Sequence, residues 1–182
     1  MKNKPFITRY VAKKRLGLIF QGLKKLEKII PKNNIKILDV GCGDGYFTRA
    51  IRNKGYTIVG IDLQTPDTAS WISFKPDYIM DATNMTFKDN TFDAVISLEV
   101  VEHVQCIPEI NRVIKPGGLF FCSTPARNTE WVRHIVVWLH LLENQDFEHH
   151  DYIEDLHKCC MKVLKYRKMF LGTSQFGILT KN

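Results

Sequence analysis

The residues of this chain with the clearest chemical potential are three glycines at alternate positions in the run 37–45, Ile-Leu-Asp-Val-Gly-Cys-Gly-Asp-Gly. The apolar start of this run predicts a buried parallel strand, and the glycines predict a sharp turn into a helix. Glycine adopts positive φ without strain, and because it has no Cβ a ligand can contact the backbone. The run therefore predicts a loop that binds a ligand through its main chain.

A second candidate is Asp62, which ends the apolar segment 57–62, 21 residues after Gly41. A carboxylate in this position can hold both hydroxyls of a ribose, a geometry shared by nicotinamide enzymes and adenosylmethionine enzymes. A dinucleotide site requires G-x-G-x-x-G, but here the third glycine falls one position early and Tyr46 follows it. No G-x-x-x-x-G-K-[ST] pattern occurs, so a phosphate-binding P-loop is excluded.

A third set, Glu99, Glu102 and His103, is spaced at i, i+3 and i+4, which would place the three side chains on one face of a helix. Two carboxylates and an imidazole can form half of a divalent metal site, with a further ligand from His149 or His150. The same residues can line an acceptor pocket without a metal, or serve only the structure. The residues alone leave these alternatives open.

The elements that position these candidates follow from the hydrophobic pattern. Strands alternate with helices up to Pro125, and each strand is nearly all apolar, which predicts an α/β fold with a parallel sheet covered on both faces. A closing antiparallel hairpin is expected at the end of the chain. The expected strands are 35–40, 57–62, 77–80, 92–97, 119–124, 165–171 and 176–180, and the expected helices are 6–30, 46–53, 99–114, 130–142 and 152–164.

Composition limits the class of protein. The length of 182 residues suits one domain, and the hydrophobic fraction of 45% is ordinary for a globular protein. Residues 1–54 carry 14 Lys/Arg against 3 Asp/Glu, so the N-terminal helix is a solvated face or a contact for nucleic acid or an anionic membrane. Five cysteines without a C-x-x-C pair, and no visible signal peptide or membrane span, predict a cytoplasmic protein with reduced thiols.

Five motifs in register carry a family resemblance. The glycine run, Val-Gly-Ile-Asp at 59–62, Asp81-Ala82, and the segments 92–104 and 113–118 together resemble the class I S-adenosylmethionine-dependent methyltransferases. The motifs cover roughly residues 35–125. The resemblance implies a single Rossmann-like methyltransferase domain with a mostly parallel seven-stranded sheet. Within it, residues 1–32 would form a basic helix, 35–125 the cofactor-binding core, and 126–182 the acceptor-side helices and final hairpin.

The resemblance also implies roles for single residues toward S-adenosylmethionine. Gly41, Gly43 and Gly45 would line the methionyl part, with Asp39 near its ammonium group. Asp62 would bind the ribose, Asp81 and the Ala82 N–H the adenine, and Ser97 and Leu98 would lie near the sulfonium. The remaining residues expected to bind the cofactor are Cys42 and Leu63.

On the acceptor side the E-x-x-E-H run and Ser-Thr-Pro at 123–125 resemble two metal-assisted branches, the ubiquinone-biosynthesis O-methyltransferases and the methyltransferases of RNA 2′-hydroxyl ends. The resemblance implies a small-molecule acceptor methylated on oxygen, with Glu102, His103 or His150 orienting or deprotonating it. A magnesium-like ion on Glu99, Glu102, His103 and His150 is an optional addition. The RNA-end enzyme is the alternative, and a non-catalytic cofactor-binding module a further one; the sequence does not predict the oligomeric state.

Overall fold

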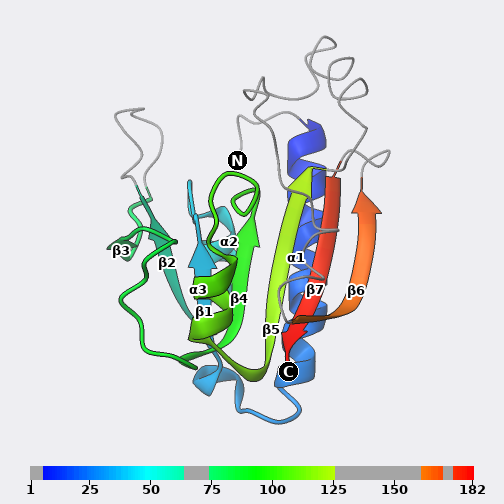
Figure 1. Ribbon diagram of the computed structural model, residues 1–182. Coiled ribbons are helices and arrows are strands. Elements are labelled where there is room, and N and C mark those ends of the chain that lie inside the picture. Colours follow the sequence, from blue (N-terminus) through cyan, green and yellow to red (C-terminus); the bar gives the residue numbers. More distant parts are fainter. Residues whose placement is uncertain (1–5, 64–73, 126–160, 170–173) are drawn as a thin grey trace.

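The computed structural model describes residues 6–63, 74–125, 161–169 and 174–182. Seven strands of these residues form one sheet, whose arrangement can be followed in Figure 1. Their order across the sheet is β3-β2-β1-β4-β5-β7-β6. The first five strands pair in parallel, and β7 is antiparallel to both of its neighbours. The strand bounds are β1 Lys36–Val40, β2 Thr57–Asp62, β3 Tyr78–Ile79, β4 Phe92–Leu98, β5 Ile114–Pro125, β6 Met161–Met169 and β7 Ser174–Lys181.

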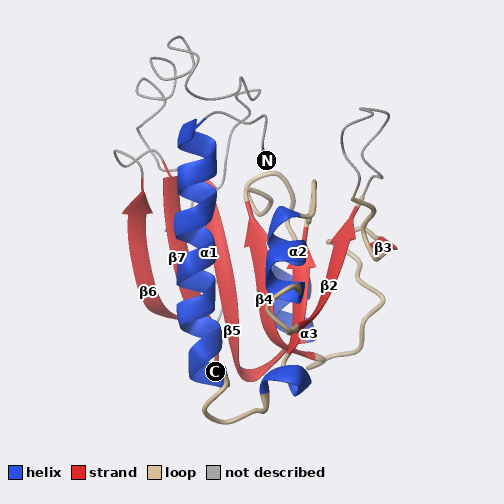
Figure 2. Cartoon of the chain, turned by 180° about the vertical axis from the view of Figure 1, so that it is seen from behind, coloured by secondary structure: helices blue, strands red, loops and turns tan. Residues whose placement is uncertain are grey.

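The central strands β1 and β4 are buried along most of their length because both faces of the sheet are covered. The helices α1 (Phe6–Leu26) and α2 (Tyr46–Arg52) lie on one face, and α3 (Ile107–Val113) lies on the other (Figures 1 and 2). A short 3-10 helix, Lys32–Asn34, leads into β1. The predicted α/β class, the parallel sheet and the final antiparallel hairpin are confirmed.

Helix α1 is held to the sheet by an apolar stripe. Ile19 and Leu23 are fully buried, and burial of side chains of this size contributes about 1.5–3 kcal/mol each. Gly22 permits the close approach, because a Cβ at this position would lie 2.5 Å from Cε1 of Phe121 on β5. Within the described ranges, no helix is both long enough and apolar enough to cross a bilayer.

The prediction of a helix over residues 99–114 is wrong in its first half. Residues 99–106 form turns, and α3 begins only at Ile107, with Pro108 in its first turn. Glu99 has a φ of 58°, a left-handed conformation from which a helix does not propagate. The main-chain bonds from His103 and Val104 to the carbonyl of Val100 close a single turn and nothing longer.

The boundaries of three strands also differ from the prediction. The residues 161–164 belong to β6, not to a helix, because they pair with β7 from Met161 onward. Strand β5 begins at Ile114, and the predicted turn at 115–118 is an irregularity within it, where its register with β4 shifts after Phe92. The predicted strand 77–80 is reduced to the pair β3. The predicted helix 130–142, most of 152–164, and His149 and His150 lie outside the described residues.

Candidate functional site

The glycine loop lies at the carboxyl end of β1, between that strand and α2. Gly41, Gly43 and Gly45 have φ angles of 68°, 49° and 67°, a region that other residues enter only with strain. In an open parallel sheet, ligands bind beyond the carboxyl ends of the strands where the strand order reverses. That reversal falls between β1 and β4, so the sequence places the loop at the point where this fold binds ligands.

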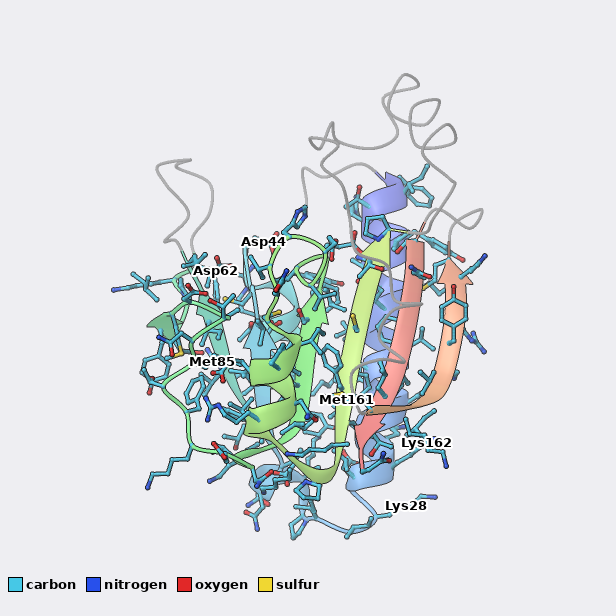
Figure 3. The ribbon with its side chains drawn as sticks, viewed as in Figure 1. Lys28, Asp44, Asp62, Met85, Met161 and Lys162 are labelled. Carbon is cyan, nitrogen blue, oxygen red and sulfur yellow. The ribbon has the colours of Figure 1, made fainter. Side chains whose placement is uncertain are left out.

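The loop is anchored to β2 through its main chain. The N–H groups of Gly41 and Cys42 donate to the carbonyl of Ile61 at 2.9 and 3.0 Å. The N–H of Gly43 donates to Oδ2 of Asp62 at 2.8 Å. Figure 3 shows Asp44 and Asp62 at the same edge of the sheet. Asp62, the last residue of β2, therefore lies beside the glycine loop and holds its backbone in place.

The three glycines differ in what surrounds them. A Cβ on Gly41 would lie 2.4 Å from Cγ2 of Val100, and one on Gly45 would lie 2.2 Å from the ring of Phe74. A Cβ on Gly43 would meet no atom of the described residues within 4 Å. Gly41 and Gly45 therefore serve close packing, whereas the backbone at Gly43 borders open space where a ligand can approach.

Asp39 is a buried acid directly before the loop. It lies on β1 and accepts a hydrogen bond from Oγ1 of Thr48 on α2 at 2.6 Å. The pKa of Asp39 is raised to about 7, chiefly by burial; the hydrogen bond from Thr48 acts in the opposite direction, and the nearby charge of Asp62 adds to the rise. A carboxyl with such a pKa changes its ionisation when a cation is placed next to it.

The other side chains predicted to bind the cofactor lie at neighbouring strand ends. Asp81 follows β3 at the surface, and hydrogen bonds from the N–H and hydroxyl of Thr83 hold its pKa below the usual range. Leu63, just after Asp62, is exposed. Ala82 is partly buried against the apolar core beneath α3.

Ser97 lies near the end of β4, paired with Val40 of β1 on one side and Cys122 of β5 on the other. It is fully buried, and within the described part of the chain its hydroxyl has no hydrogen-bond partner. Buried hydroxyls are normally paired, since an unpaired one costs free energy. Leu98 follows as the last residue of β4 and is only half-buried.

Glu99 is held by an arginine from the N-terminal helix. Nη2 of Arg15 donates to Oε1 of Glu99 at 2.5 Å and to Oγ of Ser174 at 2.6 Å. The hydroxyl of Ser123 donates to the same Glu99 oxygen at 3.0 Å. The side chains of Arg15 and Glu99 are 11% and 30% exposed, so this ion pair is partly shielded from water. It ties α1 to the ends of β4, β5 and β7.

The predicted convergence of Glu99, Glu102 and His103 on one helix face is not found, because these residues lie in a bend and a turn and not in a helix. Glu102 is buried and His103 is exposed. Across the described ranges, no three His, Cys, Asp or Glu side chains are grouped as a metal site would require. The fourth suggested ligand, His150, lies outside those ranges.

Sequence reasoning missed Arg15 as a site residue. The signal was available: Arg15 lies three residues after Ala12 and four before Ile19, on the stripe of α1 that faces the sheet. A charged residue on a buried stripe requires a partner of opposite charge. The partner itself could not be identified, because Glu99 is 84 residues away in the chain.

Comparison with known proteins agrees with this geometry. The family described as methyltransferase domain matches residues 11–161. The mitochondrial ubiquinone biosynthesis O-methyltransferase of Dictyostelium discoideum is 32% identical over 142 residues, covering 66% of this chain and 44% of that protein. The ubiquinone biosynthesis O-methyltransferase of Rickettsia felis is 32% identical over 147 residues, covering 70% and 60%. The chain thus spans about half the length of these relatives.

Among solved structures, a protein described as a SAM-dependent methyltransferase from Methanosarcina mazei superposes with a TM-score of 0.62 at 19% identity. The superposition covers 86% of this chain and 96% of that one, which shows a shared fold. The family match covers most of the chain, including the glycine loop and β1 to β5. The chain therefore belongs to the methyltransferase domain family and has the fold of the S-adenosylmethionine-dependent methyltransferases.

Proposed function

We propose that this protein transfers a methyl group from S-adenosylmethionine to an oxygen atom of a small molecule. The observation that carries the proposal is the glycine loop at the end of β1, anchored on Asp62 and open above Gly43. The oxygen acceptor is supported by the two ubiquinone O-methyltransferases to which the chain is similar.

The cofactor would lie along the carboxyl ends of β1, β2 and β4. The methionyl part fits the open space at Gly43, between the packed glycines Gly41 and Gly45 and beside Cys42. An ammonium group near Asp39 would favour the ionised form of that carboxyl, which burial otherwise disfavours.

The nucleoside would follow on the β2 side of the loop. One oxygen of Asp62 accepts the Gly43 N–H, which fixes the carboxylate for hydrogen bonds from a ribose. The exposed leucine after it, Leu63, offers an apolar contact, and Asp81 with the Ala82 N–H would bind the adenine. Ser97 and Leu98 would lie near the sulfonium, where the hydroxyl of Ser97 gains a partner.

The reaction requires little covalent help, because the bound sulfonium supplies an activated methyl group. The acceptor oxygen must lie in line with the methyl, and its proton must pass to a base or to water. The side chains proposed to orient or deprotonate the acceptor are Glu102, His103 and His150. Glu102 is buried close to the end of β4, and His103 is exposed to solvent. The described residues do not fit a metal ion, since Glu99 is bound to Arg15, and no step here relies on one.

Calorimetric titration with S-adenosylhomocysteine tests the cofactor site directly. The wild type should bind, and Asp62→Ala should bind at least tenfold more weakly because the loop loses its anchor and the ribose its acceptor. Asp89→Ala is the matched control, since Asp89 is an exposed acid paired with Arg112 away from the loop. Absence of binding by the wild type would overturn the proposal.

A second assay addresses the acceptor. Release of homocysteine from the product cofactor is followed with panels of phenolic and hydroxylated small molecules, and in parallel with short RNA. Turnover only with RNA would replace the small-molecule proposal by the RNA-end alternative.

A further inference from the structure

A basic groove runs along the outer flank of α1, beside the end of β6. It has a volume of about 660 Å³. Helix α1 covers the end of the sheet formed by β7 and β6 (Figure 2). The residues that line the groove come from α1 and from β6, so each element forms one wall. The residues that line it are Tyr10, Val11, Lys13, Lys14, Gly17, Leu18, Gln21, Arg167, Lys168 and Met169.

The charge of this lining has one sign. Among the described residues that line the groove, four are cations, from both walls, and none is a carboxylate. Nζ of Lys165 on β6 donates to Oε1 of Gln21 on α1 at 3.3 Å and joins the two walls at the end of the groove. Like charges gathered around a hollow raise its potential and favour an anionic occupant.

The rest of the lining is apolar or aromatic. Val11, Leu18 and Met169 contribute hydrocarbon surface, and Tyr10 contributes a ring, with Nζ of Lys14 5.4 Å from its centroid. An occupant that carries only charge would leave this surface in water. The lining therefore suits a molecule with an apolar body and an anionic head.

Gly17 makes room for such an occupant. Glycine in the interior of a helix is less favourable than alanine. Within the part of the chain that the structure describes, a Cβ at Gly17 would meet no atom within 4 Å. The packing of α1 on the sheet therefore does not require glycine here. The missing side chain instead widens the groove between Lys13, Lys14 and Gln21.

The shape of the groove favours a small molecule over a membrane surface as its occupant. A hollow of this volume lies within the range of small-molecule sites, roughly 300–1,000 Å³. A bilayer surface is broad and would contact the side chains that protrude from α1, not the recess that the missing side chain of Gly17 leaves between them. We propose that the groove binds an amphipathic anion, a molecule with an apolar chain or ring and a phosphate or carboxylate head. None of the described residues that line it belongs to the glycine loop or to the Arg15–Glu99 pair, so the site is separate from the proposed cofactor site.

The test uses dodecyl phosphate below its micellar concentration as the probe, titrated calorimetrically into the full chain. Saturable binding is expected, weakening as salt screens the cations. Gly17→Leu should reduce the affinity for dodecyl phosphate at least tenfold, because the leucine side chain fills the recess at this position. Gly17→Ala also favours the helix but fills little space, so it should reduce the affinity no more than threefold. The double substitution Lys13→Ala/Arg167→Ala should also reduce affinity at least tenfold.

The matched control is Lys24→Ala/Lys25→Ala, which removes the same charge from α1 outside the groove and should change affinity less than twofold. Equal losses in the control and the groove variants would show non-specific attraction and overturn the proposal. Inorganic phosphate that binds as tightly as dodecyl phosphate would overturn the amphipathic assignment.

The source of the anion is resolved by vesicles of phosphatidylglycerol and phosphatidylcholine. Vesicle binding lost in Gly17→Leu identifies a lipid head as the occupant, and absent vesicle binding with retained dodecyl phosphate binding identifies a soluble anion. Vesicle binding unchanged in Gly17→Leu, with no saturable binding of the free probe, overturns the site. Binding of S-adenosylhomocysteine should be unaffected throughout, so this test and that of the cofactor site fail independently.

Discussion

Asp39 offers the most quantitative test of the site, because its burial links protein stability to pH. The carboxyl has a pKa of 3.8 in the unfolded chain and about 7 in the folded protein. Between these values it is ionised when unfolded and protonated when folded. Because the folded protein holds this proton more tightly than the unfolded chain does, the group's contribution to stability is fully present below pH 3.8 and is lost as the pH rises to about 7.

The size of the effect follows from the two pKa values. Each pH unit within the window corresponds to about 1.4 kcal/mol, so the full shift of about 3 units corresponds to at most about 4 kcal/mol. Asp39→Asn removes the titration, and its side-chain oxygen can still accept from Thr48 Oγ1. The free energy of unfolding of the variant should therefore rise relative to that of the wild type by about 2 kcal/mol between pH 5 and pH 7, and by little more up to pH 8, because the folded carboxyl is itself half ionised near pH 7.

Urea denaturation at half-unit steps from pH 5 to pH 8 measures this difference. Histidines and other groups titrate in both proteins and cancel in the difference between them. Thr48→Val is the second variant: it removes the hydrogen bond that lowers the pKa of Asp39, so the loss of stability should extend above pH 7. Parallel stability curves for the wild type and Asp39→Asn would refute the reasoning.

Three further predictions concern packing, pairing and reactivity. Gly43→Ala should lower the free energy of unfolding by about 1–2 kcal/mol, the strain of a left-handed backbone, and should weaken the binding of S-adenosylhomocysteine at least tenfold. Gly41→Ala should lower the free energy of unfolding distinctly more, because its Cβ meets Val100; equal losses of stability in urea denaturation would contradict this. Arg15→Ala should cost about 3 kcal/mol by leaving the charge of Glu99 without its partner, and Glu99→Ala added to it should recover part of the loss in a double-mutant cycle; simple additivity would count against the pair. Cys122 should resist iodoacetamide at pH 8 in the native protein and react in urea, because burial raises the pKa of its thiol well above the usual value; labelling of the native protein detected by mass spectrometry would show access to the strand.

The parallel sheet and the glycine loop could be predicted because their signals are local. The mostly apolar sequences of β1, β2 and β4 indicate strands that are buried on both faces, and each of these strands ends within two residues of its predicted position. The glycines of the loop occupy positive φ as expected, because no other residue does so without strain. Local sequence was sufficient wherever the backbone conformation follows from the residue type itself.

The turn at 99–106 could not be predicted, because its conformation depends on distant residues. Glu99 enters the left-handed region although it is not glycine, and its carboxylate is held there by Arg15 and Ser123, from different parts of the chain. The spacing of Glu99, Glu102 and His103 therefore suggested a common face that does not exist. The start of β6 was misassigned for a similar reason, since only its pairing with β7 makes 161–164 a strand.

The position of β7 inside the sheet has a consequence for how the protein is made. Strand β7 is inserted between β5 and β6, with Phe176 and Leu179 in the core, so its two edges are both paired. In the pairing of β5 with β7, Leu119 lies opposite Thr180, a residue far away in the chain. Closing such long-range pairs is slow because the intervening chain must first be ordered. During synthesis, β5 has no partner on that side until β7 has left the ribosome, and until then its open edge is exposed to other chains.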